Sequence, residues 1–266
     1  MIEPRREAFN WAADTIETTA TQNPVILWMC NTSRREILAT FPAGAALVEI
    51  GCGTGADAVF LAERNYRIAA VDISDRMVEL SRKRASAQKV EGRVFVWRGR
   101  LQDVAGELGR SQWCPFDGAY ANFSLAYEDS LREVAATVRS LLKPGARFVF
   151  TLPNRLCLSE PAIALARLRI RRALGRFREP RLATIHGMTV RVHLYTPSHV
   201  RKILRGLFDI ETIAGVPVFM PPPSFYRLSF ERLRASLESF DDRLAARFPW
   251  SHLGETTLFR ARKVGL

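Results

Sequence analysis

The chain has 266 residues, of which 47% are hydrophobic and 25% are charged, which is typical of a folded globular protein and excludes a largely disordered one. Its net charge is +12, no run of about 18 apolar residues is present, and the first residues lack the apolar stretch of a secretion signal, so we expect a cytoplasmic protein without a transmembrane helix. The four cysteines lie far apart in the sequence, which predicts reduced thiols and neither a disulfide framework nor a metal site.

Between residues 45 and 152, short apolar runs alternate with longer segments of helical period. The apolar runs predict strands over 45–50, 67–71, 93–97, 116–121 and 147–152. The segments between them predict helices over 56–64, 75–87 and 129–142. Ser74 is expected to cap the second helix, and Lys143-Pro144-Gly145 ends the third. Repeated β-α units of this length predict an α/β fold, a doubly wound, Rossmann-like parallel sheet with helices on both faces.

This regular alternation ends at Pro153. Residues 155–180 are rich in arginine and have a partial helical period, and residues 188–195 alternate as a β-ribbon does. Thr196 and Pro197 predict the start of a helix that runs to about residue 207. Further strands are predicted over 208–213 and 255–262, with a charged helix or helix pair over 225–247 between them.

Three alternating glycines, Gly51, Gly53 and Gly55, lie between the first predicted strand and the first predicted helix. There they permit a tight turn and let a ligand approach the backbone. Asp72 ends the next strand, where a carboxylate can accept hydrogen bonds from two ribose hydroxyls.

Three interpretations of this loop compete. It is a tight turn without a ligand, a dinucleotide site through the loose G-x-G-x-x-A pattern that Ala56 completes, or a site for S-adenosylmethionine. Glu49 argues against the dinucleotide, because an acid at that point repels a pyrophosphate but suits a ligand with an amino group and a sulfonium.

Four segments of the chain carry a family resemblance. The first reads VEIGCGTGADAVFLAERNYRIAAVDISDRMVELSRKRA and closely resembles the first two motifs of class I S-adenosylmethionine-dependent methyltransferases of the bacterial small-molecule type. FDGAYANFSLAY resembles the fourth-strand motif of that family, LLKPGARFVFTLPN its fifth-strand motif, and LGETTLFRARK its last, antiparallel strand. The resemblance covers residues 8–152 closely and 194–264 more loosely, and it implies a seven-stranded sheet whose last strand is antiparallel.

The resemblance also implies how the chain is organised. We expect an N-terminal helical lid (1–44), a cofactor-binding Rossmann-like core (45–154), a basic cap inserted after the fifth strand (155–195), and a C-terminal part that completes the sheet (196–266) around a helical excursion (224–248).

The same resemblance implies residues that hold S-adenosylmethionine and its product S-adenosylhomocysteine. Glu49 and the glycine loop would hold the methionine part, and Asp72 the ribose hydroxyls. Arg100 stands where the family has the acid that binds the adenine amino group, which leaves Leu101 and Gln102 as candidates there. The full predicted set is Glu49, Gly51, Cys52, Gly53, Gly55, Asp72, Ile73, Met77, Leu101, Gln102 and Asn122.

Methyl transfer from a sulfonium depends mainly on alignment of the acceptor and exclusion of water, so we name no catalytic residue. The candidates for contact with the substrate are Tyr127, His186, His193 and Tyr226. The sequence after the fourth strand lacks the Asn/Asp-Pro-Pro-aromatic motif that accompanies methylation of exocyclic or amide nitrogens. This absence disfavours N-methylation of nucleic acids as the function.

Nine arginines, two acids and no lysine occur between Arg155 and Arg191, so this segment holds +7 of the net charge of +12. It predicts a solvated surface helix, a contact with an anionic group of the substrate, or a peripheral contact of residues 162–178 with an anionic membrane. Nucleic acid is disfavoured as a partner because aromatic residues do not interleave with the basic ones.

The sequence thus predicts a methyltransferase that acts on oxygen or nitrogen of a small molecule, as a monomer or a homodimer. Two alternatives stay open. One is a protein of the same fold that transfers no methyl group, such as an S-adenosylmethionine-dependent cyclase or a binding module. The other is an RNA methyltransferase.

Overall fold

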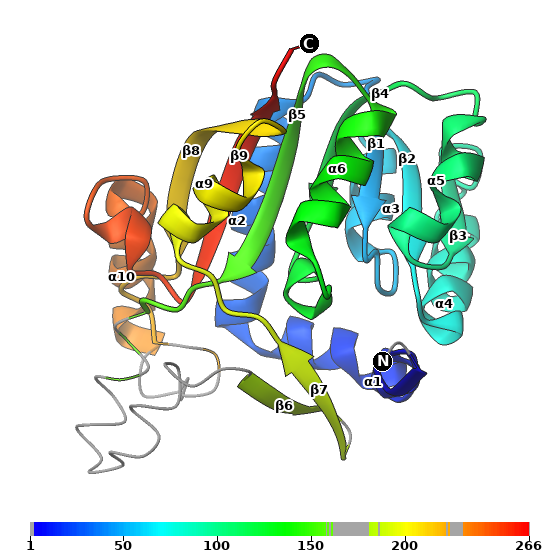
Figure 1. Cartoon of the computed structure of the whole chain (residues 1–266). Helices are drawn as coiled ribbons and strands as arrows, with labels where there is room; N and C mark the ends of the chain where they lie inside the picture. The colour runs from blue at the N-terminus through cyan, green and yellow to red at the C-terminus, as the bar shows by residue number, and fades with distance from the viewer. Residues whose placement is uncertain are drawn as a thin grey trace.

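The computed structural model describes residues 3–157, 159, 161, 181–185, 187–221, 223 and 231–265. Within these residues, seven strands form one sheet in the order β3-β2-β1-β4-β5-β9-β8 (Figure 1). They are β1 (Ala46–Ile50), β2 (Arg67–Asp72), β3 (Val94–Arg98), β4 (Phe116–Ala121), β5 (Leu142–Pro153), β8 (Phe208–Val216) and β9 (Thr256–Lys263). Strands β1 to β5 pair in parallel, whereas β9 is antiparallel to both of its neighbours, β5 and β8. The predicted doubly wound sheet with an antiparallel last strand is confirmed.

Helices cover both faces of this sheet. One face carries α2 (Pro24–Thr40), α3 (Ala56–Ala62) and α4 (Asp75–Ala87), and the other carries α5 (Leu101–Gly109), α6 (Leu131–Leu141) and α9 (Pro197–Leu204). None of the described helices is both long and apolar enough to cross a membrane.

The alternation of side chains along β1 places one functional candidate on a particular face. Val48 and Ile50 enter the core beneath α5 and α6, whereas Leu47 enters the core beneath α2 and α3. Because successive side chains of a strand point to opposite faces, Glu49 shares the face of Leu47. The acid before the glycine loop therefore points toward α2 and α3.

Capping side chains fix several helix starts. Ser74 caps α4 and Thr196 caps α9, as predicted, and Asn23 caps α2. Each side-chain oxygen accepts a hydrogen bond from a backbone N–H of the first turn, which that helix cannot satisfy by itself.

The structure contains two elements that were not predicted from the sequence. Strand β6 (Arg181–Ile185) pairs with β7 (Met188–Val192), so the ribbon predicted from residue 188 is the second half of a hairpin. Helix α5 follows β3 and was not predicted; it contains two glycines within a short segment, which lower its intrinsic helix propensity.

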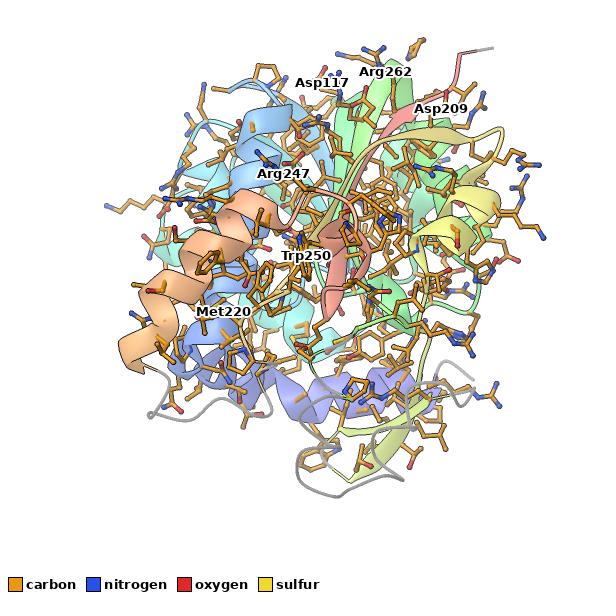
Figure 2. The ribbon with its side chains drawn as sticks, turned by 90° about the vertical axis from the view of Figure 1, so that its left-hand side faces the viewer. Asp117, Asp209, Met220, Arg247, Trp250 and Arg262 are labelled. Carbon is orange, nitrogen blue, oxygen red and sulfur yellow. The ribbon has the colours of Figure 1, made fainter. Side chains whose placement is uncertain are left out.

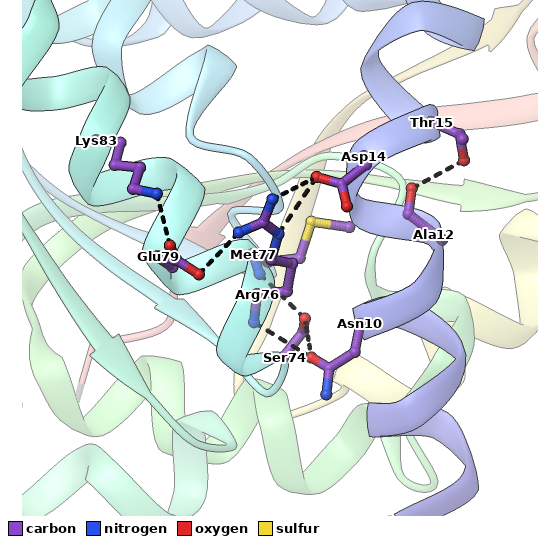
Figure 3. Close-up of polar contacts among 9 residues, drawn as sticks. All are labelled: Asn10, Ala12, Asp14, Thr15, Ser74, Arg76, Met77, Glu79 and Lys83. Carbon is purple, nitrogen blue, oxygen red and sulfur yellow. Dashed lines mark hydrogen bonds and ion pairs between the residues drawn. The ribbon is translucent and has the colours of Figure 1, made fainter.

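Helix α1 (Glu3–Gln22) crosses the carboxyl ends of the parallel strands (Figure 1). Figure 3 shows the polar contacts that join it to the start of α4. Ser74 Oγ donates to Asn10 Oδ1 at 2.6 Å, and Arg76 Nη2 donates to Asp14 Oδ1 at 2.8 Å. Most of the residues that α1 buries are alanines, so these polar contacts are a large part of what holds it over the sheet.

Helix α10 (Glu231–Leu244) lies beside the edge of the sheet that β8 forms (Figures 1 and 2). Its anchor is Asp241, whose side chain is fully buried and accepts hydrogen bonds from the backbone N–H groups of Val218, Phe219 and Met220. These bonds fix the loop that follows β8, the loop that later reaches Pro223.

Candidate functional site

A cavity of about 720 Å³ opens at the carboxyl edge of the sheet. Its walls come from the segments that follow β1, β2, β3 and β4, and from α1 and α2. In parallel α/β sheets, ligands bind at this edge, where loops from neighbouring strands meet. The glycine loop and the carboxylates predicted beside it lie together at this cavity.

The glycines of the loop serve different purposes. Gly53 has a φ of +53°, and a Cβ added to it would meet no heavy atom within 4 Å, so its backbone lies bare at the cavity. A Cβ on Gly55 would lie 2.3 Å from Ser81 Oγ, so this glycine permits α3 to approach α4. Gly55 does not line the cavity.

Asp72 ties the loop to the end of β2. Its Oδ2 accepts a hydrogen bond from Gly53 N at 2.8 Å and its Oδ1 accepts one from Ser74 N at 2.9 Å. Burial raises the pKa of the Asp72 carboxyl group, and these backbone N–H groups oppose the rise by stabilising the carboxylate. Each oxygen keeps lone pairs that can accept a further hydrogen bond from a ligand.

Glu49 lies deeper in the cavity and is only 2% exposed. Its Oε2 is buried and has no hydrogen-bond partner. Burial raises the pKa of Glu49 well above its usual range, and the nearby carboxylates of Asp57 and Asp72 add to the rise, whereas the hydroxyl group of Tyr120 opposes it. A cationic donor bound beside Glu49 would lower that pKa and pair with the ionised carboxylate, so the position is complementary to such a group.

A polar network that sequence reasoning missed lies between α2 and the loop after β4. Arg34 Nε donates to Asp57 Oδ1 at 2.6 Å, and Asn122 Nδ2 donates to Asp57 Oδ2 at 2.7 Å. Ser33 Oγ donates to Asn122 Oδ1, which fixes the orientation of the amide. Asn122 was predicted as a site residue, but Arg34 sits in a helix without a recognisable motif, and only the fold brings it to the cavity.

A second cluster joins α1 to the loop after β4, where Tyr127 was predicted and Arg5 was not. Arg5 Nη1 donates to the Tyr127 carbonyl oxygen, and its Nη2 lies 3.5 Å from Glu128 Oε1. Arg100 Nε lies 4.0 Å from Glu128 Oε2. Burial raises the pKa of Glu128 although both guanidinium groups lower it. The ring of Tyr127 also meets Phe9 of α1 edge to face, with centroids 5.0 Å apart.

Most of the predicted site residues line this cavity. They are Glu49, Gly51, Cys52, Gly53, Asp72, Ile73, Met77, Leu101, Asn122 and Tyr127. Gly55 and Gln102 are not among its lining residues, and neither is His193, whose backbone N–H donates to Ala126 O at 2.8 Å. His186 and Tyr226 lie outside the described residues, as does most of the arginine-rich segment, including 162–178. The roles assigned to all of these residues from sequence stay predictions.

The chain is similar to several known proteins. A family model described as a methyltransferase domain matches residues 29–207. An S-adenosyl-L-methionine-dependent Diels-Alderase of Talaromyces variabilis is 34% identical over 117 residues, which are 43% of this chain and 38% of that protein. An O-methyltransferase of Aspergillus nomiae is 28% identical over 106 residues, which are 39% of this chain and 44% of that protein. The similarity thus spans less than half the length of these two curated relatives.

A solved structure supports the fold independently. The 1,6-didemethyltoxoflavin-N1-methyltransferase of Burkholderia thailandensis superposes with a TM-score of 0.60 at 17% identity, over 99% of this chain and 88% of that chain. The family match covers more than half of the present chain and extends from α2 through α9, so it includes the glycine loop, Asp72 and the loop after β4. The chain therefore belongs to the family of proteins with this methyltransferase domain.

Proposed function

We propose that this protein binds S-adenosylmethionine in the cavity and transfers its methyl group to an oxygen or nitrogen of a small molecule. The observation that carries the proposal is the arrangement of Glu49 and Asp72 around the bare backbone of Gly53. Glu49 Oε2 is buried at the cavity wall without a hydrogen-bond partner, and a donor of a bound ligand would complete it. A ligand with an ammonium group and two ribose hydroxyls supplies donors for both carboxylates.

The other parts of the cavity fit the same ligand. Ile73 and Met77 would pack against the adenine, with the backbone near Leu101 at its edge. Arg34 would bind the carboxylate of the methionine part, since its guanidinium group lies at the cavity and is held in place by Asp57. Helix α1, joined to α4 and to Tyr127, would act as the predicted lid.

Bound S-adenosylmethionine would supply a methyl group already activated on a sulfonium. The chain then has to orient the acceptor, exclude water and, for an acceptor that arrives protonated, take up its proton. Tyr127 and Glu128 lie on the cavity wall and are held by α1, so they are suited to contact the acceptor.

An S-adenosylmethionine-dependent cyclase is the second candidate. It is favoured by the 34% identity with the Diels-Alderase, the highest identity among the curated relatives named above. Both functions would use the same cofactor pocket and differ in the fate of the methyl group.

Two measurements test these proposals. Titration calorimetry with S-adenosylmethionine and S-adenosylhomocysteine should show binding to one site, and its absence would contradict both candidates. Mass spectrometry of reactions with acceptor libraries then separates them. An acceptor heavier by one CH₂, together with release of S-adenosylhomocysteine, supports methyl transfer. A rearranged product of unchanged mass, with the cofactor intact, supports cyclisation.

A further inference from the structure

Part of the cavity wall has no role in binding the cofactor proposed above. It is apolar and consists of Ile16, Ile26, Leu27, Phe123 and Pro223. Ile16 and Leu27 are each 41% exposed, and large apolar side chains with that exposure at a cavity mouth are typical of a ligand-binding surface. Burial, together with the nearby Asp57, raises the pKa of the Cys30 thiol on the same wall to about 11, as expected in apolar surroundings.

The charged groups of the cavity disfavour an anionic acceptor. The described wall contains four arginines and six carboxyl groups. Arg84 is paired with Glu17, and both Arg5 and Arg100 with Glu128. Arg34, which is held by Asp57, is assigned above to the carboxylate of the cofactor. A sulfonium beside the acceptor would repel a cation. An uncharged acceptor needs no unpaired arginine and is not repelled by the sulfonium.

The apolar wall is also held in a fixed shape. Phe123 has a φ of +56°, a left-handed conformation that is costly for a bulky residue, and its N–H donates to Thr151 Oγ1 at 2.7 Å. Asn23 Nδ2 donates to Pro223 O at 3.1 Å, which joins the loop after β8 to the start of α2 beside Ile26 and Leu27. Strain of this kind persists where the surrounding structure imposes it, often at ligand sites.

We infer that the acceptor is an uncharged, largely apolar molecule whose body lies against Ile16, Leu27 and Phe123 while its reacting end faces the cofactor. The inference rests on the proposed function, because it assigns the rest of the cavity to the acceptor. It applies equally to a methyl acceptor and to the substrate of a cyclase.

The test uses three probes that share one ring system and differ in charge: 2-naphthol, 2-naphthoate and 2-naphthylmethylammonium. Their affinities for the full chain are measured by fluorescence titration with S-adenosylhomocysteine at saturation. We expect 2-naphthol to bind at least about tenfold more tightly than 2-naphthoate, a ratio that corresponds to about 1.4 kcal/mol. The affinity for 2-naphthylmethylammonium should fall when S-adenosylmethionine, which carries the sulfonium, replaces S-adenosylhomocysteine. Leu27→Ser should weaken 2-naphthol by about tenfold and leave the affinity for S-adenosylhomocysteine unchanged.

The matched control is Leu233→Ser, which changes a leucine that is 56% exposed on α10 and absent from the cavity wall. It should leave the binding of 2-naphthol unchanged. With S-adenosylhomocysteine bound, the inference is overturned if naphthoate binds as tightly as naphthol, if naphthol does not bind, or if both leucine variants weaken it equally. Failure of S-adenosylhomocysteine itself to bind would instead contradict the proposed function.

Discussion

Replacing Asp72 by alanine is expected to remove most of the affinity for S-adenosylhomocysteine. Each carboxylate oxygen accepts one backbone N–H, from Gly53 and from Ser74, and keeps lone pairs for a ribose hydroxyl. A hydrogen bond to an ionised group contributes about 1.5–3 kcal/mol, so two of them contribute about 3–6 kcal/mol. At about 1.4 kcal/mol for each factor of ten, the Kd should rise by at least about 100-fold.

The assay is titration calorimetry at neutral pH, after circular dichroism has shown that the variant is folded. Asp72→Asn keeps one acceptor oxygen and should have an intermediate Kd. The control is Asp75→Ala, which removes an exposed carboxylate that pairs with Arg98 at 2.9 Å and should change the Kd by less than about twofold. A folded Asp72→Ala protein whose Kd stays within about threefold of the wild type would refute the assignment of the ribose site.

Three further predictions address other parts of the molecule. Burial raises the pKa of Glu49 in the folded state, so ionisation of this group favours the unfolded state as the pH rises above the ordinary carboxyl range. Glu49→Gln should therefore increase Tm by an amount that grows between about pH 4 and 8. Thermal melts in which this gain in Tm shrinks with rising pH would contradict the prediction. Arg34→Ala should weaken S-adenosylhomocysteine by at least about tenfold but leave methylthioadenosine, which lacks the amino acid part, unaffected, and equal losses in calorimetry would exclude a contact with the carboxylate. Asp241→Ala leaves three backbone N–H groups without their acceptor and should lower the free energy of unfolding, measured in urea, by about 3–5 kcal/mol. The control Asp242→Ala breaks an exposed pair with Arg35 and should lower it by less than about 1 kcal/mol. Similar losses for the two variants would show that Asp241 is not the anchor of α10.

Features that depend on neighbouring residues were predictable. Hydrophobic period and capping residues located β1, β4, α4 and α9, because strand burial and helix capping act within one element. Helix α5 was not predicted, although Leu101, Val104 and Leu108 have helical spacing and are buried against the sheet, and its two glycines lower its intrinsic helix propensity. Tertiary packing, which a sequence pattern does not contain, stabilises that helix.

The sequence by itself predicted the residues that are proposed to bind the cofactor. Glu49, the three glycines and Asp72 stand at fixed distances along one β-α-β unit, and the right-handed connection of such units brings them to one edge of the sheet. Their chemistry could be predicted because their spatial proximity follows from their spacing.

Only the tertiary structure decided the rest of the cavity. Arg5 meets Glu128 and Asn23 meets Pro223 across gaps of more than a hundred residues, and no local pattern encodes such meetings. The same holds for Arg34, which reaches Asp57 because α2 packs on the face of the sheet that Glu49 shares. The long-range packing of α1, α2 and the loop after β8 therefore sets the shape and charge of the part of the cavity that is proposed to bind the acceptor, since those walls come from distant parts of the chain.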